Sequence, residues 1–185
     1  NEPLYDPALL SATQRAIADL LRDSLMFWGL SGSFKVKPVP TLVIASINYI
    51  ESDSLKKWEI FRKRQVSSFF AIESIFEEAR LSNDFVVFDA ETRDSVYALH
   101  NFFEPENFSA PSPIEIRALY NLEVEFLLTG ELFTESNSVK IRLYLCKIDK
   151  DGLIIEKQAE EILPEDNLEK FSQTLKLLTS KLLKI

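Results

Sequence analysis

The sequence predicts a single α/β domain of the α+β kind, with a mixed sheet of about five strands, a C-terminal antiparallel meander and helices on both faces. Two features lead to this prediction. Helical and strand patterns alternate from residue 11 to residue 122, which is typical of crossover connections and a partly parallel sheet. From residue 124 the apolar period changes to two, which indicates paired antiparallel strands. Because 185 residues suit one domain, we expect residues 1–185 to fold together.

The first part of the chain reads as an amphipathic helix, a buried strand and a second helix. After an extended segment at 1–10, residues 11–28 place apolar side chains at helical spacing. The nearly continuous apolar run at 41–50 predicts a strand that is buried on both faces. Residues 52–82 predict a helix that breaks near Gln65. The second half of this helix carries one apolar stripe made of Val66, Phe69, Phe70, Phe76 and Ala79.

The middle of the chain predicts one more strand and two more helices. Residues 85–88 form a short β-rich strand, and residues 92–103 return to helical spacing. A proline-containing loop follows at 101–113. Ser112, Pro113 and Glu115 then occupy the N-cap, N1 and N3 positions of a capping box, which predicts a helix to about residue 122.

The last part of the chain predicts three strands and a C-terminal helix. The strands are expected at 124–133, 138–148 and 153–159, and their short turns require hairpins. In the helix at 165–185, a heptad-like stripe must be covered either by this domain's sheet or by a second chain. We favour docking on the sheet, and therefore a monomer in isolation. The stripe consists of Leu168, Phe171, Leu175, Leu178, Leu182 and Ile185. We also predict that Ile44, Phe70, Val87 and Leu143 are buried together between the sheet and the helices.

Composition excludes several classes of function. A net charge of −8 argues against a nucleic-acid partner, because proteins that bind phosphates usually carry a basic face. Cys146 is the single cysteine and His100 the single histidine, so neither a disulfide nor a Cys/His metal cluster is expected. The sequence also contains neither a glycine-rich phosphate loop nor a G-x-S-x-G elbow. We therefore predict a non-enzymatic protein without cofactor or metal.

Acidic residues follow the strand at 85–88. Asp89, Glu91 and Asp94 lie where open α/β sheets often bind ligands, at the carboxyl end of a strand. Alternatively, Asp89 or Thr92 caps the next helix and the other carboxylates favour its positive end. The capping interpretation is favoured, and the ligand interpretation stays open.

Two further groups of side chains are candidates for partner binding. Loop 101–113 holds Phe102, Phe103 and Phe108, and aromatic side chains often anchor interfaces, although folding back onto the domain is favoured. The second group is a basic cluster around Trp58 and Phe61, which is either a contact surface for an anionic partner or a solvated helical face. The basic cluster consists of Lys56, Lys57, Arg62, Lys63 and Arg64.

Three stretches of the chain carry a resemblance to a group of bacterial envelope proteins. They are the strand at 41–48, the helix-to-strand passage at 76–89 with Phe85-Val86-Val87, and the hairpin start at 124–132 with Leu128-Thr129-Gly130. The sequence resembles the group that includes FlgO-type flagellar lipoproteins, the penicillin-binding-protein activator LpoB and the N-terminal domain of TolB. It departs from that group at Asn83-Asp84, where a glycine is usual, and in the long loop before Ser112.

The resemblance implies a location and a class of function. It implies a periplasmic, outer-membrane-associated domain that binds another envelope protein, with membrane association only through a lipid anchor outside this chain. The implied process is flagellar or concerns the regulation of cell-wall synthesis. The alternative is a periplasmic domain that binds a small molecule or a peptide.

Overall fold

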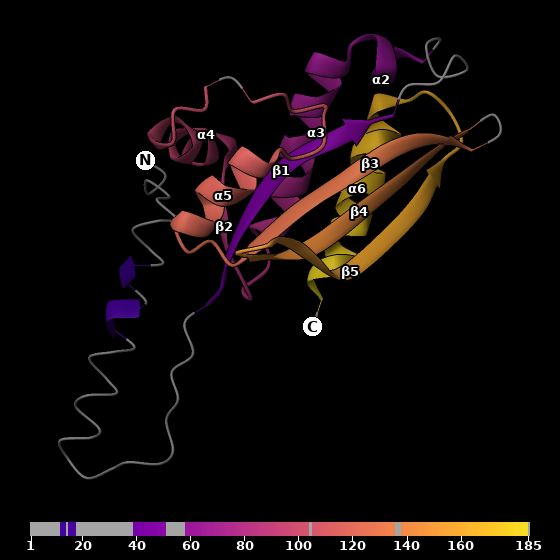
Figure 1. Cartoon of the computed structure of the whole chain (residues 1–185). Helices are drawn as coiled ribbons and strands as arrows, with labels where there is room; N and C mark the ends of the chain where they lie inside the picture. Colours follow the sequence, from indigo (N-terminus) through magenta and orange to yellow (C-terminus); the bar gives the residue numbers. More distant parts are fainter. Residues whose placement is uncertain are drawn as a thin grey trace, which may run out of the picture.

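A mixed sheet forms the centre of the molecule (Figure 1). The computed structural model describes residues 12–13, 15–17, 39–50, 58–103, 105–135 and 138–184, so most of the helix predicted at 11–28 lies outside the described residues. Within them, five strands follow the spatial order β2-β1-β3-β4-β5. The predicted α+β class and mixed sheet are confirmed. The strands are β1 (Thr41–Tyr49), β2 (Val86–Phe88), β3 (Phe126–Glu135), β4 (Ser138–Asp149) and β5 (Gly152–Leu163).

The connections between the parallel strands place helices on both faces. β1 pairs in parallel with both β2 and β3, which lie on its two sides. The chain passes from β1 to β2 and then crosses back over β1 to β3. Since such crossovers are right-handed, their helices come to lie on opposite faces of the sheet. The first crossover contains α2 (Glu59–Arg62) and α3 (Arg64–Ala79), and the second contains α4 (Ala90–Leu99) and α5 (Pro113–Asn121).

Two hydrophobic cores lie on the two sides of the sheet. Alternate side chains of β1 point to opposite faces, so that Leu42 and Ile44 enter the core beneath α3 and α6, whereas Val43 and Ala45 enter the core beneath α4 and α5. β1 is therefore buried on both faces, as predicted. The predicted core group is confirmed for Ile44, Val87 and Leu143, which share the first core, whereas Phe70 packs against it only partly buried.

The C-terminal helix α6 (Leu168–Leu183) packs on β4, β5 and α3. Docking on the domain's own sheet is confirmed for the buried part of the predicted stripe, namely Phe171, Leu175, Leu178 and Leu182. Leu168 is 45% exposed, and Ile185 lies outside the described residues. The helix begins later than predicted because the Asn167 side chain caps it, accepting a hydrogen bond from the Lys170 backbone at 3.0 Å.

Helix α3 buries a different face from the predicted stripe. Val66 and Phe69 are exposed, and the stripe prediction was wrong at these positions. The buried face carries serines whose hydroxyls donate to carbonyl oxygens, for example Ser74 Oγ to the Phe70 oxygen at 2.8 Å. Small side chains with satisfied hydroxyls let α3 approach α6 closely, and the Oγ atoms of Ser74 and Ser172 are 2.8 Å apart. The buried residues of α3 are Ser67, Ser68, Ala71, Ile72, Ser74, Ile75 and Ala79.

Several other element bounds differ from the prediction, among them the ends of α4 and β5. α4 ends at Leu99 and not at Phe103, because Asn101 adopts a left-handed backbone conformation with φ 58°. β5 continues beyond residue 159 to Leu163, and its residues 159–163 all pair with β4. The predicted capping box of α5 is confirmed, with the Ser112 backbone donating to Glu115 Oε2 at 2.6 Å.

Candidate functional site: a groove between α3 and α4

The three loop aromatics have different surroundings. Phe102 meets Tyr97 edge-on at 5.8 Å between ring centroids, and Phe108 packs against the core under α3 and α6. The loop is also tied to β1, because the Tyr49 backbone donates to the Phe108 oxygen at 3.0 Å. Phe103, by contrast, is 67% exposed. A role in partner binding stays a prediction, and of these three rings Phe103 is the most accessible.

The basic cluster adjoins this loop. The guanidinium of Arg64 lies over the Phe108 ring at 4.7 Å, so the structure brings together two groups that the sequence suggested separately. Arg62 and Lys63 are exposed, and Lys63 pairs with Glu59 at 2.7 Å. Trp58 and Phe61 turn toward the core. Lys56 and Lys57 lie outside the described residues, and a binding role for the cluster stays a prediction.

The acidic residues after β2 have two structural tasks. Asp89 is the N-cap of α4 and accepts a hydrogen bond from the Thr92 backbone at 2.8 Å, as the capping interpretation predicted. Asp94 pairs with the buried Arg93 at 2.7 Å. Glu91 is exposed, and no ion pair to it occurs among the residues that the structure describes. Helix capping therefore accounts for Asp89 and ion pairing accounts for Asp94, but neither role accounts for Glu91.

These carboxylates line one side of a groove between α3 and α4. The groove has a volume of about 680 Å³ and lies beside the end of β2. Helix α3 contributes Phe69, Glu73 and Phe76 to one wall. The opposite wall is formed by small and acidic residues that begin at the α4 N-cap, namely Asp89, Ala90, Glu91, Asp94, Ser95 and Ala98. The groove thus combines an aromatic wall with a facing wall of short side chains and carboxylates.

Phe69 of the aromatic wall is exposed to an extent that folding does not require, whereas Phe76 packs partly buried against the core. Phe69 is 54% exposed and Val66, one turn before it, is 66% exposed. On the same helix, Ser67, Ser68 and Ser74 are buried. Phenylalanine is usually buried and serine usually exposed, and α3 shows the opposite arrangement. Exposed apolar surface of this kind often marks a contact site.

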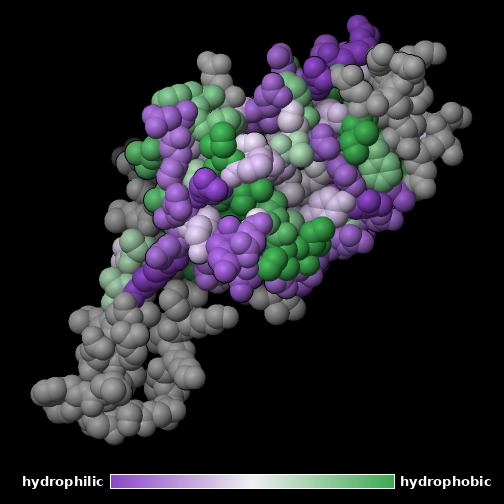
Figure 2. All heavy atoms as spheres, in the orientation of Figure 1, coloured by the Kyte–Doolittle hydropathy of each residue, from purple (hydrophilic) through white to green (hydrophobic). Residues whose placement is uncertain are grey.

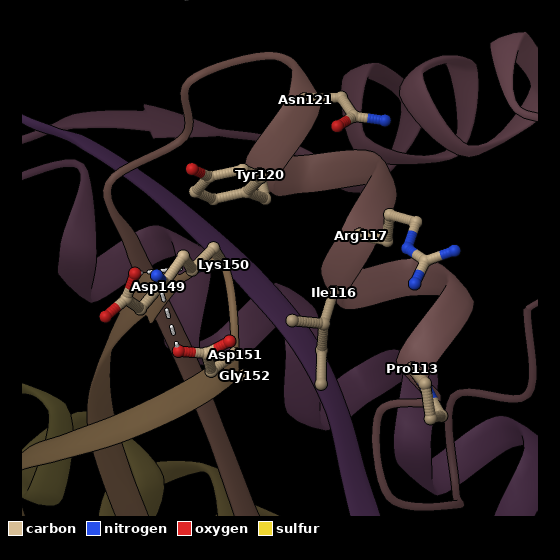
Figure 3. Close-up of a pocket in the computed structure, with 9 residues that line it drawn as sticks. All are labelled: Pro113, Ile116, Arg117, Tyr120, Asn121, Asp149, Lys150, Asp151 and Gly152. Carbon is tan, nitrogen blue, oxygen red and sulfur yellow. Dashed lines mark hydrogen bonds and ion pairs between the residues drawn. The ribbon is translucent and has the colours of Figure 1, made fainter.

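A second hollow of about 480 Å³ lies between α5 and the turn from β4 to β5 (Figure 3). The turn contributes Asp149, Lys150 and Asp151, and the Lys150 and Asp151 side chains pair at 4.0 Å. Arg117 and Tyr120 come from α5. Because its two cations balance its two carboxylates, this hollow lacks the one-sided charge of the α3–α4 groove.

The open part of the sheet on the α5 side carries charges that pair with one another. Arg142 contacts Glu131 at 3.0 Å and Glu160 at 2.9 Å, and the Tyr144 hydroxyl donates to Glu131 at 2.7 Å. Hydrogen bonds from Arg142 and Lys140 lower the pKa of Glu160. Figure 2 shows hydrophilic residues over much of this face, beside a hydrophobic patch. The charged side chains on this face of the sheet therefore pair mostly with one another.

Sequence reasoning found Asp89, Glu91 and Asp94 but missed the facing wall. Phe69 was assigned to the same stripe as Phe70 and Phe76, and only the structure shows that Phe69 is exposed while the other two rings pack partly buried against the core. The available signal was the spacing of the serines and alanines of α3, which favours close packing of one helix on another.

The remaining candidates for chemistry lie apart. His100 is the C-cap residue of α4 and does not line the groove. Burial raises the pKa of the Cys146 thiol to about 11. In the described ranges, no group of three or more His, Cys, Asp or Glu side chains could hold a metal ion. Nor is any helix in the described part of the chain long and apolar enough to cross a membrane.

No protein-family model and no curated protein sequence matches the chain. Among solved structures, it is similar to the LpoB C-terminal domain from Escherichia coli, with 10% identity, 76% of this chain and 93% of that chain covered, and a TM-score of 0.42. It is also similar to lipoprotein GNA1162 from Neisseria meningitidis, with 9% identity, 78% and 96% covered, and a TM-score of 0.41. Similarity at this level concerns the arrangement of helices and strands alone.

Proposed function

We propose that this chain is a non-enzymatic, periplasmic protein-interaction domain of a bacterial envelope lipoprotein. The resemblance of the stretches at 41–48, 76–89 and 124–132 to the FlgO, LpoB and TolB group supports the location. In this proposal, a lipid anchor outside this sequence holds the domain at the outer membrane. The domain assists flagellar assembly or regulates cell-wall synthesis by binding another envelope protein.

The exposed aromatic face of α3 carries the interaction part of the proposal. Phe69 and Val66 remain exposed although Ser67 and Ser68 of the same helix are buried, so the two apolar side chains contribute little to the core. Aromatic anchors supply much of the energy at many protein interfaces. A partner that covered this face would remove their apolar surface from water, which is favourable.

A peptide-binding domain is a second candidate. The groove beside Phe69 has a volume of about 680 Å³, within the usual range of pockets that bind ligands. Its walls carry both apolar groups and carboxylates, which would suit a short peptide segment. In that case the bound molecule would be a free peptide instead of a segment of a folded partner.

The proposal can be tested by fractionation and by quantitative affinity capture of the full-length protein. The wild-type protein, Phe69→Asp and Leu177→Asp would be compared, because Leu177 on α6 is exposed to a similar extent, at 49% against 54%. We expect one envelope protein to be retained by the wild type and by Leu177→Asp but lost with Phe69→Asp. Recovery of the protein in the cytosolic fraction, or equal capture by all three proteins, would refute the proposal.

A further inference from the structure

We infer that the α3–α4 groove accepts a cationic amphipathic helix of the partner protein, with apolar side chains against Phe69 and Phe76 and Lys or Arg side chains beside Glu73 and Glu91. This inference rests on the proposed interaction function and adds the chemistry of the bound segment. It follows from the shape of the groove, from its apolar wall and from the balance of charge in its lining.

The two walls leave room for side chains of the partner. Phe69 and Phe76 stand on α3, seven residues apart, and therefore lie two turns apart on one side of that helix. The α4 wall carries Ala90 and Ala98, whose short side chains project little into the space. A volume of about 680 Å³ holds a few side chains, so the backbone of a bound segment would lie above the groove. This geometry suits a helix laid along the groove, anchored by residues at i, i+3 or i+4, and i+7.

The charge of the lining selects a cation. Four carboxylates and no Lys or Arg line the groove. Asp94 is neutralised by Arg93 at 2.7 Å, and Asp89 is occupied by capping α4. Glu73 and Glu91 stand on opposite walls, and neither has an ion-pair partner among the described residues. An acidic segment or a nucleic acid would be repelled, whereas Lys or Arg would find a carboxylate on each side.

Long cationic side chains also match the aromatic wall. The methylene stems of Lys and Arg pack on apolar surface while their charged ends stay in water. A cation above a phenylalanine ring gains a further electrostatic attraction, as Arg64 does over Phe108 at 4.7 Å elsewhere in this molecule. The groove therefore recognises a segment in which apolar and basic residues alternate at helical spacing.

Two synthetic peptides test the inference directly. Both are about 15 residues long, the length at which isolated helices begin to be stable, and both place leucines at helical spacing. One carries lysines at the remaining positions, and the other carries glutamates. With the full chain, fluorescence anisotropy should show binding of the lysine peptide at least about tenfold tighter than the glutamate peptide, and this difference should shrink as salt is added.

Matched variants locate the binding. Glu73→Gln with Glu91→Gln should weaken the lysine peptide roughly three- to tenfold, as expected for two exposed ion pairs. Glu156→Gln with Glu169→Gln makes the same change of net charge at exposed positions on β5 and α6 and should leave the affinity unchanged. Equal affinity for the two peptides, or an equal loss in both double variants, would overturn the inference. So would peptide-free dimerisation through this groove, because a second copy would then be its occupant.

The inference and the proposed function can fail separately. If Phe69→Asp abolishes capture of the envelope partner while the lysine peptide shows no preference, the interaction face stands and the cationic occupant is wrong. If Phe69→Asp leaves partner capture intact, the proposed interaction face is itself wrong.

Discussion

Arg93 of α4 donates a hydrogen bond from Nη1 to the carbonyl oxygen of Ile44 in β1 at 3.2 Å. β1 pairs with β2 up to Val43, and its Ile47 backbone hydrogen-bonds to loop 101–113. The Arg93 contact at Ile44 lies between these two parts of β1. Arg93 also donates from Nη2 to Asn107 Oδ1 at 2.9 Å. Its guanidinium therefore completes the edge of β1 and holds loop 101–113 against the sheet.

Replacing Arg93 should destabilise the domain. Arg93→Met would leave the Ile44 oxygen and the Asn107 side chain without these donors and Asp94 without its cation. We expect a loss of about 3 kcal/mol in the free energy of unfolding, measured by denaturant titration. Arg117→Met on the exposed face of α5 should change stability by less than about 0.5 kcal/mol. A loss below about 1 kcal/mol for Arg93→Met would show that water replaces the guanidinium.

Gly130 should not tolerate a side chain. A Cβ atom there would lie 2.5 Å from the Arg142 backbone oxygen and 2.6 Å from Leu143 Cδ2, so β3 and β4 would have to separate. We expect Gly130→Ala to cost about 1–3 kcal/mol in denaturant titration. Wild-type stability in this variant would mean that the strands separate easily at this point.

Gly152 should be sensitive for another reason. A Cβ atom there meets no other atom within 4 Å, but its φ of 135° disfavours any L side chain. Gly152→Ala should therefore cost about 1–2 kcal/mol through backbone strain alone, again measured by denaturant titration. An unchanged free energy of unfolding would mean that the turn adopts another conformation without loss.

Helix α6 offers a matched pair of leucines. Leu175 is fully buried against the core, whereas Leu177 is 49% exposed. We expect Leu175→Ala to cost about 2–5 kcal/mol and Leu177→Ala less than about 0.5 kcal/mol. Light scattering should show a monomer for the wild type. A stable dimer that Leu175→Asp converts into a folded monomer would contradict the docked position of α6.

The thiol of Cys146 should react only in the unfolded chain. Because burial raises its pKa to about 11, the folded protein holds a neutral thiol at pH 8, and the thiolate is the reactive form. Labelling with a disulfide reagent should therefore be slow in buffer and fast in denaturant. Rapid labelling of the folded protein would show that the β4 region opens locally.

The same thiol should make stability depend on pH in alkaline solution. Below the ordinary thiol pKa both states are protonated, so Cys146 adds no pH dependence. As the pH rises toward 11, the unfolded chain loses the proton first, and the folded state becomes less stable. Denaturant titrations of the wild type and Cys146→Ala should therefore diverge between about pH 9 and pH 11. Parallel curves would contradict the raised pKa.

Much of the fold could be predicted because strong local patterns coincided with the final packing. The alternating residues of β4 and the capping box at Ser112 left few alternatives. The end of α4 could not be predicted from apolar spacing, since Leu99 and Phe103 continue the helical period while Asn101 turns left-handed between them. The spacing of apolar residues does not reveal a single residue with a left-handed backbone conformation.

The candidate site was predicted only in part. The acidic side followed from the position of Asp89 after a strand, which is a topological rule. The aromatic side depends on how α3 packs against α6, because α3 turns its serine face toward α6, as in the contact of Ser74 with Ser172, and leaves Phe69 exposed. This orientation of α3 involves contact between two helices nearly 100 residues apart in sequence. The small residues of α3 indicate a close helix contact, but they do not identify α6 as the helix that makes it.

In-cell photocrosslinking from position 69 tests the central claim most directly. A photoreactive residue replaces Phe69 in one strain and the similarly exposed Leu177 in another, and the products are identified by mass spectrometry. The account predicts one discrete product with an envelope protein from position 69, which disappears when Glu73→Lys and Glu91→Lys are added, and no such product from position 177. The same product from both positions, or none from position 69, would contradict the claim that the α3–α4 groove is the binding face.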